Sequence, residues 1–403
     1  MSEWKKVKLG ELYEVHNGLS KGRQFFGTGF PFLTFSDVFN NWFLPEQLES
    51  LVQTTDKERE ACSIKAGDVF ITRTSETMDE LGMSSVALKD YPNATYNGFT
   101  KRLRPITDRV NPRYIGYYLR TSKFRGQFMA FSTMTTRASL ANNDLLNMEV
   151  ELPPMETQHR IATILSRYDS LIENYQKQIK LLEEAAQRLY KEWFIDLRFH
   201  GHENTKIVDG VPEGWERKKV NSIIELQSGF AFKSSTFDDN GTYKIVTIKN
   251  VKDGAFDGDN VSKIVAIPEK MPKHCVLADG DILLSLTGNV GRVCIVNGKN
   301  YLLNQRVAKL ATDYKAFAYC LFRSRDMFIE VNNLANGAAQ QNVSPIRIGG
   351  IKMLLPNMDM LQKFESTASK LITRIIYLQS QLRLLTEARD RLLPKLMCGE
   401  IEI

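Results

Sequence analysis

The sequence repeats itself once, and each copy takes up about half of its 403 residues. Trp4 and Trp215 open the similar phrases WKKVKLGELYEVHNG and WERKKVNSIIELQSG, and their offset of 211 residues places Gly18 over Gly229. Self-similarity of this kind decides the whole architecture, so it has to be recognised first. The chain is therefore expected to hold two copies of one domain, which also suits a length beyond what one hydrophobic core usually supports.

Further matches follow in the same order along both copies. FLTFSDV lies over IVTIKNV and AGDVFITRT over DGDILLSLT at an offset of 213 residues. Later, YIGYYLRTS meets FAYCLFRSR and VELPP meets MLLPN at an offset of 203 residues. The change of offset indicates extra residues in the first copy, around 75–109. Both copies thus share a framework, while the connections between the framework segments have diverged.

Within each copy, short apolar runs alternate with Gly, Asp, Asn and Pro turn signals, which is typical of mixed β-rich domains. A few helices are expected, for example over 112–128 and 314–332. The first copy also carries a crowd of aromatic side chains: Phe25, Phe26, Phe30, Phe32, Phe35, Phe39, Trp42 and Phe43. We interpret them as core and turn packing in preference to a platform on which bases stack.

Neither Gly nor Pro occurs between Pro154 and Gly201, and apolar residues recur there at alternating steps of four and three. The seam comprises Ile161, Leu165, Tyr168, Ile172, Tyr175, Ile179, Leu182, Ala186, Leu189 and Trp193. An equivalent seam 203 residues later comprises Phe364, Ala368, Leu371, Ile375, Leu378, Leu382, Leu385, Leu392 and Leu396, and only Arg389 interrupts it. Heptads of this length predict two long helices that pair as a coiled coil.

If the equivalent halves pack about an approximate two-fold axis, the two helices must run antiparallel, as a stalk of roughly 50 Å. The expected fold class is α+β, with two similar mixed β-rich domains separated by two long antiparallel coiled-coil helices. The predicted segments are residues 1–155 for the first domain, 156–200 for the central helix, 201–357 for the second domain and 358–403 for the C-terminal helix. The length of the stalk is comparable to about one and a half turns of B-DNA, and a helical hairpin or dimerisation stalk without any link to DNA is the alternative interpretation.

The composition suits a soluble globular protein and disfavours several other classes. A net charge of +6 and a pI near 8.9 favour an anionic partner, although charge alone does not identify one. The five cysteines are scattered and form no Cys-x-x-Cys pair, which argues against a disulfide framework or structural zinc and for a reducing cytoplasm. Neither a signal-like start nor an apolar run of membrane-spanning length is present, so no membrane partner is expected.

Motifs for catalysis are missing from the sequence. It has no Asn/Asp-Pro-Pro-Tyr/Phe motif for methyl transfer, and the glycine pair in Thr287–Arg292 lacks the Lys-Ser/Thr that completes a phosphate loop. His200, His202 and Glu203 lack a third and fourth partner, so a solvated linker is preferred over a metal site. The five histidines give no sign of a catalytic triad. We expect no catalytic residue, metal or cofactor in this chain.

The order of domain, long helix, domain and long helix resembles the specificity subunit of type I restriction-modification enzymes. The phrases that carry this resemblance are SEWKKVKLGEL and VPEGWERKKV, KAGDVFITRT and ADGDILLSLTGNVGRV, and ELPPMETQHRIATIL and RLLPKLMCGEIEI. Together they extend over essentially the whole chain. One departure is that METQHR and MDMLQK lack the Glu-Gln pair with which the family's helices often begin.

The resemblance implies a non-catalytic chain in a prokaryotic cytoplasm, part of a phage-defence system. Each of its two target-recognition domains would read one half of an interrupted, asymmetric double-stranded DNA site. It also implies two modification subunits, docked on the helices, that use S-adenosylmethionine to methylate adenine, and restriction subunits that use ATP and Mg²⁺. Two rivals stay open: a coiled-coil interaction scaffold with two protein-binding domains, and an autonomous modification enzyme.

Lys and Arg bind phosphates and so supply affinity for DNA, whereas Arg, Lys, Asn and Gln read base edges. The residues expected to contact DNA are Arg23, Arg73, Lys101, Arg102 and Arg137 in the first domain and Lys233, Lys249, Arg292, Arg306, Gln340 and Gln341 in the second. Arg137 and Gln340 fall at one equivalent framework site. Different polar side chains at that site suit two domains that read different bases.

Overall fold

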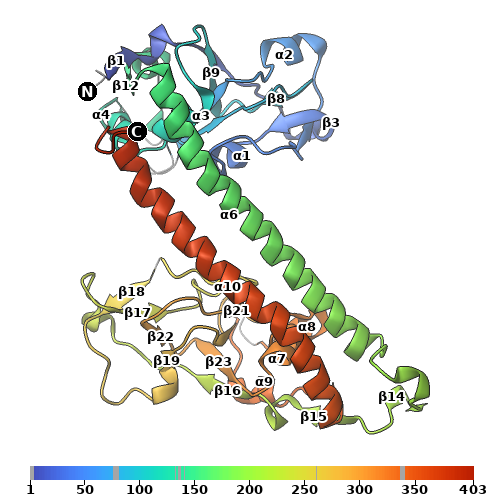
Figure 1. The fold of residues 1–403 in the computed structure, drawn as a ribbon. Helices are drawn as coiled ribbons and strands as arrows, with labels where there is room; N and C mark the ends of the chain where they lie inside the picture. The colour runs from blue at the N-terminus through green and yellow to red at the C-terminus, as the bar shows by residue number, and fades with distance from the viewer. Residues whose placement is uncertain are drawn as a thin grey trace. The chain divides into compact units, whose positions relative to one another are not determined.

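The computed structural model describes residues 4–75, 81–131, 133–134, 138–139, 141–259, 261–335 and 341–403. By its contacts the chain divides into two compact units, Met1–Leu171 with Leu385–Ile403, and Ile172–Leu384. Each unit holds one β-rich domain together with parts of both long helices, α6 (Met155–Tyr190) and α10 (Met358–Met397) (Figure 1). The division into four segments, 1–155, 156–200, 201–357 and 358–403, stays a prediction.

The first unit is built on a four-stranded antiparallel sheet in the order β2-β9-β5-β7. Its strands are β2 (Tyr13–Asn17), β9 (Thr100–Pro105), β5 (Val69–Thr72) and β7 (Ser84–Val86). Smaller sheets pair β1 (Lys5–Lys8) with β12 (Glu149–Leu152), β3 (Phe26–Leu33) with β4 (Leu51–Val52) and β8 (Thr95–Tyr96), and β10 (Thr133–Met134) with β11 (Ala138–Ser139) and β6 (Thr74–Ser75). The helices are α1 (Phe35–Asn40), α2 (Asp56–Ala61), α3 (Pro112–Tyr118), α4 (Ser122–Phe131) and α5 (Asn142–Asn147).

The second unit has the same plan. Its main sheet has the order β16-β23-β20-β21, from β16 (Glu225–Ser228), β23 (Val307–Ala311), β20 (Ile282–Ser285) and β21 (Val293–Ile295). The other sheets are formed by β15 (Glu216–Lys219) with β24 (Lys352–Leu355), β13 (Ile207–Val208) with β14 (Val211–Pro212), and β18 (Ser262–Ile264), β17 (Tyr243–Val246), β22 (Tyr301–Leu303) and β19 (Val276–Leu277). Its helices are α7 (Lys315–Arg323), α8 (Arg325–Asn333) and α9 (Pro345–Gly349). The predicted α+β class, with two similar domains and two long helices, is confirmed.

The repeated turn phrase before β5 and β20 has the same physical role in both domains. Gly67 and Gly280 adopt positive φ angles of +88° and +83°, and the aspartate that follows each is almost completely buried. Asp68 accepts two hydrogen bonds from the guanidinium of Arg104, at 2.8 and 2.7 Å. The equivalent aspartate of the second domain, Asp281, forms an ion pair with Lys309 instead. Each buried carboxylate is thus compensated by a cation on the neighbouring strand, which explains why this phrase recurs.

Both long helices contribute to the core of each unit. In the first unit, Leu165 of α6 shares a buried cluster with Leu396 near the end of α10. In the second unit, Ala186 near the end of α6 shares a cluster with Phe364 near the start of α10. Each unit therefore combines the start of one helix with the end of the other, as an antiparallel pair requires. Along the described part of the chain, no helix is both long and apolar enough to cross a membrane.

Burial follows the predicted face of each long helix. Every residue predicted for the two seams is buried or partly buried. Off the seams, apolar residues vary: Leu171, Leu181 and Leu384 are 44%, 64% and 49% exposed, whereas others such as Tyr190 and Ile372 are buried. The two helices are therefore not buried on all sides.

Arg389, which interrupts the second seam, is accommodated because its charge is paired. Its Nη1 donates to Asp169 Oδ1 at 2.9 Å, and its guanidinium lies 5.3 Å from the centroid of the Trp42 ring. Tyr117 donates its hydroxyl to the same carboxylate. All four residues belong to the first unit. The break in the heptad therefore marks a compensated ion pair between the two helices, not a weak point in their packing.

Candidate nucleic-acid interface

Three chain segments meet beyond one end of the main sheet of the second domain. The backbone of Leu286, just after β20, donates to the carbonyl of Arg306, just before β23, at 3.0 Å. Gly288 donates to the carbonyl of Gln341 at 2.9 Å, and the Thr287 hydroxyl donates to Asn342 Oδ1 at 2.9 Å. We call this meeting of segments the loop junction. It gathers polar groups from parts of the chain that lie far apart in sequence.

The first domain has an equivalent loop junction. The backbone of Arg73, just after β5, donates to the carbonyl of Phe99, just before β9, at 3.0 Å. Thr74 of β6 pairs with Ser139 of β11, as Thr287 pairs with Asn342 in the second domain. Both junctions thus have the same backbone connections, although most of their side chains differ.

A glycine allows two backbone segments to approach closely next to each loop junction. A Cβ atom on Gly18 would lie 2.0 Å from the carbonyl oxygen of Asn97, and one on Gly229 would lie 2.2 Å from that of Asn304. The residues that follow these glycines form parallel bridges, Leu19 with Asn97 and Phe230 with Asn304. Only glycine allows so close an approach between two backbones. In each domain, the glycine therefore lets the chain pack against the segment that leads into β9 in the first domain and into β23 in the second.

The loop junction of the second domain brings several predicted DNA contacts together. Arg306 and Gln341 form part of it through the hydrogen bonds given above, and both are exposed. Arg292 is partly buried, and its carbonyl accepts from Ser285 at the end of β20. Lys249 is exposed next to Ile248, whose Cδ1 would lie 3.2 Å from a Cβ on Gly288. Contact of these residues with DNA stays a prediction.

The remaining predicted contacts are placed differently. Lys233 and Arg23 are exposed, each at a short 3-10 helix, Ser234–Thr236 and Arg23–Phe25 respectively. In the first domain, Arg73 is partly buried at the loop junction. Arg137 and Gln340 lie outside the residues that the structure describes. The segments that follow these two residues are paired alike, Ser139 with Thr74 and Asn342 with Thr287.

Lys101 lies closer to the core than the sequence suggested. Only 4% of the residue is exposed, and its ammonium group donates to Asn142 Oδ1. Its pKa is lowered chiefly by burial and then by the charge of Arg73, while Asp144 acts in the opposite direction. Two cations therefore lie near each other at the first loop junction. An incoming anion would be attracted to both.

Arg102 is more deeply buried than the sequence suggested. It is 4% exposed, and its Nη1 donates to the carbonyls of Ala61 at 3.3 Å and Ser63 at 2.8 Å. Its guanidinium also lies 5.6 Å from the centroid of the Tyr96 ring. The reason is packing on both faces of the sheet: Phe70, the partner of Arg102 on β5, belongs to one buried cluster, and Leu103, on the opposite face of β9, belongs to another. These contacts hold the guanidinium within the first domain, and its contact with DNA stays a prediction.

Sequence reasoning missed Phe99. It is 57% exposed and occupies the place in the first loop junction that Arg306 occupies in the second. The repeat could have shown that Phe99 is equivalent to Arg306, since NGFTKRL at 97–103 aligns with NQRVAKL at 304–310. The aromatic cluster noted in the sequence does not include this residue. Of that cluster, Phe32 is buried and Trp42 and Phe43 pack against Tyr117, whereas Phe26 is 43% exposed.

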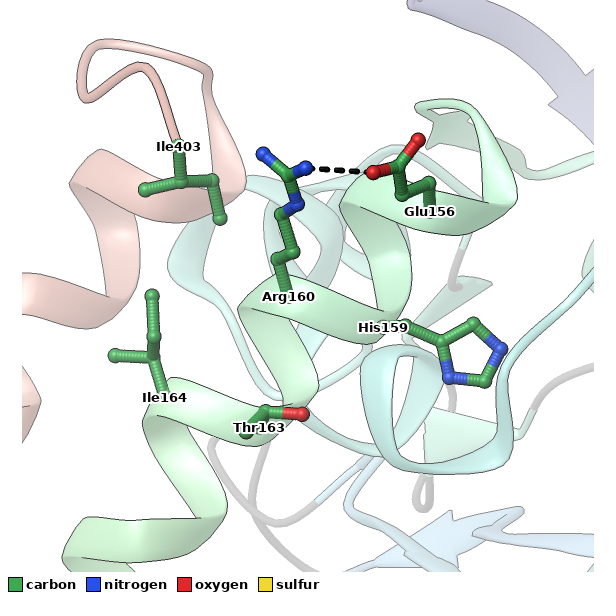
Figure 2. A pocket seen from close by; sticks show the side chains of 6 residues that line it. All are labelled: Glu156, His159, Arg160, Thr163, Ile164 and Ile403. Carbon is green, nitrogen blue, oxygen red and sulfur yellow. Dashed lines mark hydrogen bonds and ion pairs between the residues drawn. The ribbon is translucent and has the colours of Figure 1, made fainter.

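A surface depression with a volume of about 340 Å³ lies at the start of α6 in the first unit (Figure 2). Its lining consists of Glu156, His159, Arg160, Thr163, Ile164 and Ile403. Arg160 donates to Glu156 at 2.6 Å, and His159 Nδ1 lies 2.9 Å from Asn111 Nδ2. Behind it, the buried Gln158 accepts from the backbone of Asn111 and so helps to fix where the helix begins. The titratable side chains of the lining thus already have partners.

The histidine segment after α6 forms local contacts. His202 Nδ1 lies 2.8 Å from the carbonyl of Phe199 and 3.4 Å from a carboxylate oxygen of Glu203. Within the described ranges, no group of three or more His, Cys, Asp or Glu side chains could hold a metal ion. Cys62, Cys275, Cys294 and Cys320 are buried free thiols, and Cys398 is an exposed one.

Comparison with known proteins gives consistent matches along the chain. A family model described as "Type I restriction modification DNA specificity domain" matches residues 1–184 and 212–382. The chain is 27% identical over 417 residues to the type I restriction enzyme MjaIX specificity subunit of Methanocaldococcus jannaschii, and the match covers 100% of this chain and 94% of that protein. It is 21% identical over 470 residues to the type I restriction enzyme HindI specificity subunit of Haemophilus influenzae, with 100% of both chains covered.

One solved structure shows the same fold. The S subunit of a type I restriction-modification system from M. genitalium superposes with a TM-score of 0.62 at 15% sequence identity. The superposition covers 98% of this chain and 96% of that chain. At this level of identity the likeness concerns the fold.

Proposed function

The chain belongs to the family of type I restriction-modification DNA specificity subunits, and on that premise we propose that each of its two domains reads one half of an interrupted DNA site. Recognition of a DNA sequence is the function of the family. The finer proposal assigns one half-site to the loop junction of each domain. The chain itself catalyses nothing and supplies the sequence preference of a larger complex.

The observation that carries this proposal is the duplicated loop junction. Its backbone hydrogen bonds are the same in both domains, yet Arg73 and Phe99 in the first correspond to Leu286 and Arg306 in the second. A shared scaffold with exchanged side chains is what two readers of different base sequences require, because base edges are distinguished by side-chain chemistry. The two half-sites are therefore proposed to differ, which makes the whole site asymmetric.

The partners follow from the same proposal. Modification subunits dock on α6 and α10, whose exposed apolar side chains include Leu171, Leu181, Tyr377 and Leu384. Two such subunits bring S-adenosylmethionine and methylate adenine, and restriction subunits use ATP and Mg²⁺. The complex works in a prokaryotic cytoplasm.

A methylation map tests the proposal. The chain is co-expressed with its modification subunits, and the purified complex is incubated with S-adenosylmethionine and genomic DNA, after which methylated adenines are located. The expected result is one motif with two specified parts and a fixed gap. The absence of any such motif, in a complex whose assembly is verified by its mass, would contradict the proposal.

Salt dependence separates this function from a protein-binding scaffold. A DNA reader that neutralises several phosphates loses affinity steeply between 50 and 200 mM salt, by a factor of about 10³ or more for six contacts. A scaffold whose domains bind proteins shows no such dependence on duplex DNA. Binding of a labelled duplex that carries the mapped motif is measured across this range, and a flat response would favour the scaffold.

A further inference from the structure

Phe99 and Arg306 occupy the same backbone position in the two domains. The backbone N–H of Phe99 donates to Asn97 Oδ1 at 2.9 Å, and that of Arg306 donates to Asn304 Oδ1 at 3.2 Å. The carbonyl of each accepts from the residue after the neighbouring strand, Arg73 or Leu286, at 3.0 Å. Both the donor and the acceptor of this residue are therefore fixed in the same way, and only the side chain differs.

Both side chains point away from the protein's own packing. Phe99 is 57% exposed, and Arg306 is exposed. Within the part of the chain that the structure describes, the Phe99 ring makes no aromatic or cation–π contact, and the Arg306 guanidinium makes no hydrogen bond or ion pair. A single exposed aromatic residue is ordinary. This one is unusual because it lies in the loop junction beside Arg73, at the position that carries an arginine in the other domain.

We infer that this position determines base specificity in both domains, through an apolar contact of Phe99 with a thymine methyl group in the first half-site and a hydrogen-bonded contact of Arg306 with guanine in the second. The inference rests on the proposed function and deepens it. It names the side chains that make the two half-sites different, and it names one base in each.

The chemistry of the two side chains supports these partners. A phenyl ring neither donates nor accepts a hydrogen bond, and in the major groove the C5-methyl group of thymine is the apolar feature of a base pair. A guanidinium offers two parallel N–H donors that match O6 and N7 of guanine. The two domains also carry their arginine at different positions of the junction. In the first domain Arg73 lies beside Phe99, whereas in the second Leu286, which is 3% exposed, lies beside Arg306.

The test for Phe99 uses the complex with its modification subunits and a duplex library randomised at the first half-site. Phe99→Ala is expected to lower the preference for thymine at one position by about fourfold, since one buried methyl group is worth about that factor. Ile106→Ala is the matched control, because Ile106 is also 57% exposed but follows the opposite end of β9. It is expected to leave every base preference unchanged.

Deoxyuridine provides a second measurement that removes the same methyl group from the DNA. Replacing the thymine at that position should weaken the wild-type complex by about fourfold and leave Phe99→Ala unchanged. Equal losses for both proteins would overturn the inference. A uniform loss of methylation by Phe99→Ala, without any change in base preference, would overturn it too.

Arg306 is tested at the second half-site by Arg306→Lys, which keeps the charge and removes the planar pair of donors. Discrimination for guanine at one position should fall by about fivefold or more, because a bidentate pair supplies roughly 5- to 150-fold. Arg217→Ala, on the exposed strand β15, is the control and should change no base preference. An unchanged guanine preference in Arg306→Lys would overturn this part of the inference.

These outcomes differ from failure of the proposed function. If the wild-type complex has no two-part motif, the proposed function fails. If the motif exists and both Phe99→Ala and Arg306→Lys preserve it with unchanged base preferences, the proposed function stands and the inference fails.

Discussion

Substitution of Gly229 by alanine is expected to displace the segment that carries Arg306. A Cβ atom there would lie 2.2 Å from the carbonyl oxygen of Asn304 and 2.6 Å from that of Leu303. Both obstacles are backbone atoms, so no flexible side chain can move aside. Restoring an ordinary contact of at least 3.4 Å requires a shift of about 1.2 Å.

The cost can be worked out from the bonds at this bridge. Phe230 donates to Leu303 at 2.9 Å, and Gln305 donates to Phe230 at 3.0 Å. Losing both costs about 2 kcal/mol, and forcing the backbones apart adds about 1–3 kcal/mol. The lower entropy of the unfolded alanine chain offsets up to about 1 kcal/mol of this. The expected net loss is about 3 kcal/mol, equivalent to a fall of roughly 10 °C in the melting temperature of the second unit.

Thermal unfolding of the full chain measures this loss, and methylation mapping measures its effect on specificity. We expect Gly229→Ala to lose preference at the second half-site and to keep preference at the first. Gly126→Ala in α4 is the control, because a Cβ there meets nothing within 4 Å. It should stabilise the helix by about 0.5–1 kcal/mol. A melting temperature for Gly229→Ala within 2 °C of the wild type, with the second half-site intact, would refute the reasoning.

Further predictions concern the helices, the pH response and the phosphate contacts. Arg389→Leu repairs the heptad but removes the counter-ion of the Asp169 carboxylate, which is 20% exposed and keeps the hydrogen bond from Tyr117, so the free energy of unfolding should fall by about 2 kcal/mol. Equal or higher stability in a urea titration would contradict this. The hydrogen bond from Lys21 lowers the pKa of Glu58, so its stabilisation is complete above the usual glutamate pKa and is lost as pH falls through the lowered value. Melting temperatures of the wild type and Glu58→Gln should therefore converge in acid, and a constant difference would count against the assignment. Lys249→Ala should weaken binding to all sequences alike and reduce the slope of log affinity against log salt by about one, whereas a change in base preference would show that Lys249 reads a base.

The duplication and the heptads could be predicted from the sequence because both lie in the framework. Gly18 and Gly229 mark the same close approach, and the turns at Gly67 and Gly280 have the same backbone angles. Steric constraints of this kind allow only glycine at these positions, so the same residue occurs in both copies of the repeat. The same applies to the seam residues, whose spacing follows the pitch of a helix.

The site was harder to predict, because exposure depends on which elements pack against each face of a sheet. Arg102 was expected at the surface, yet it is 4% exposed and its Nη1 donates to the carbonyls of Ala61 and Ser63. Arg389 looked like a defect until its partner Asp169, distant in sequence, was placed beside it. Phe99 was not among the predicted DNA contacts, because only polar and charged residues were considered. Its significance depends on its equivalence to Arg306, which the shared hydrogen bonds establish.

The most direct test of the central claim is the methylation motif of a chain in which residues 216–355 replace residues 5–152, so that both domains are the second one. These segments run from β15 to β24 and from β1 to β12, and they are equivalent in the repeat. We expect a motif in which the second half-site's sequence occurs on both sides of the gap and the first half-site's sequence is absent. A motif that still contains the first half-site would show that the two domains are not separate readers.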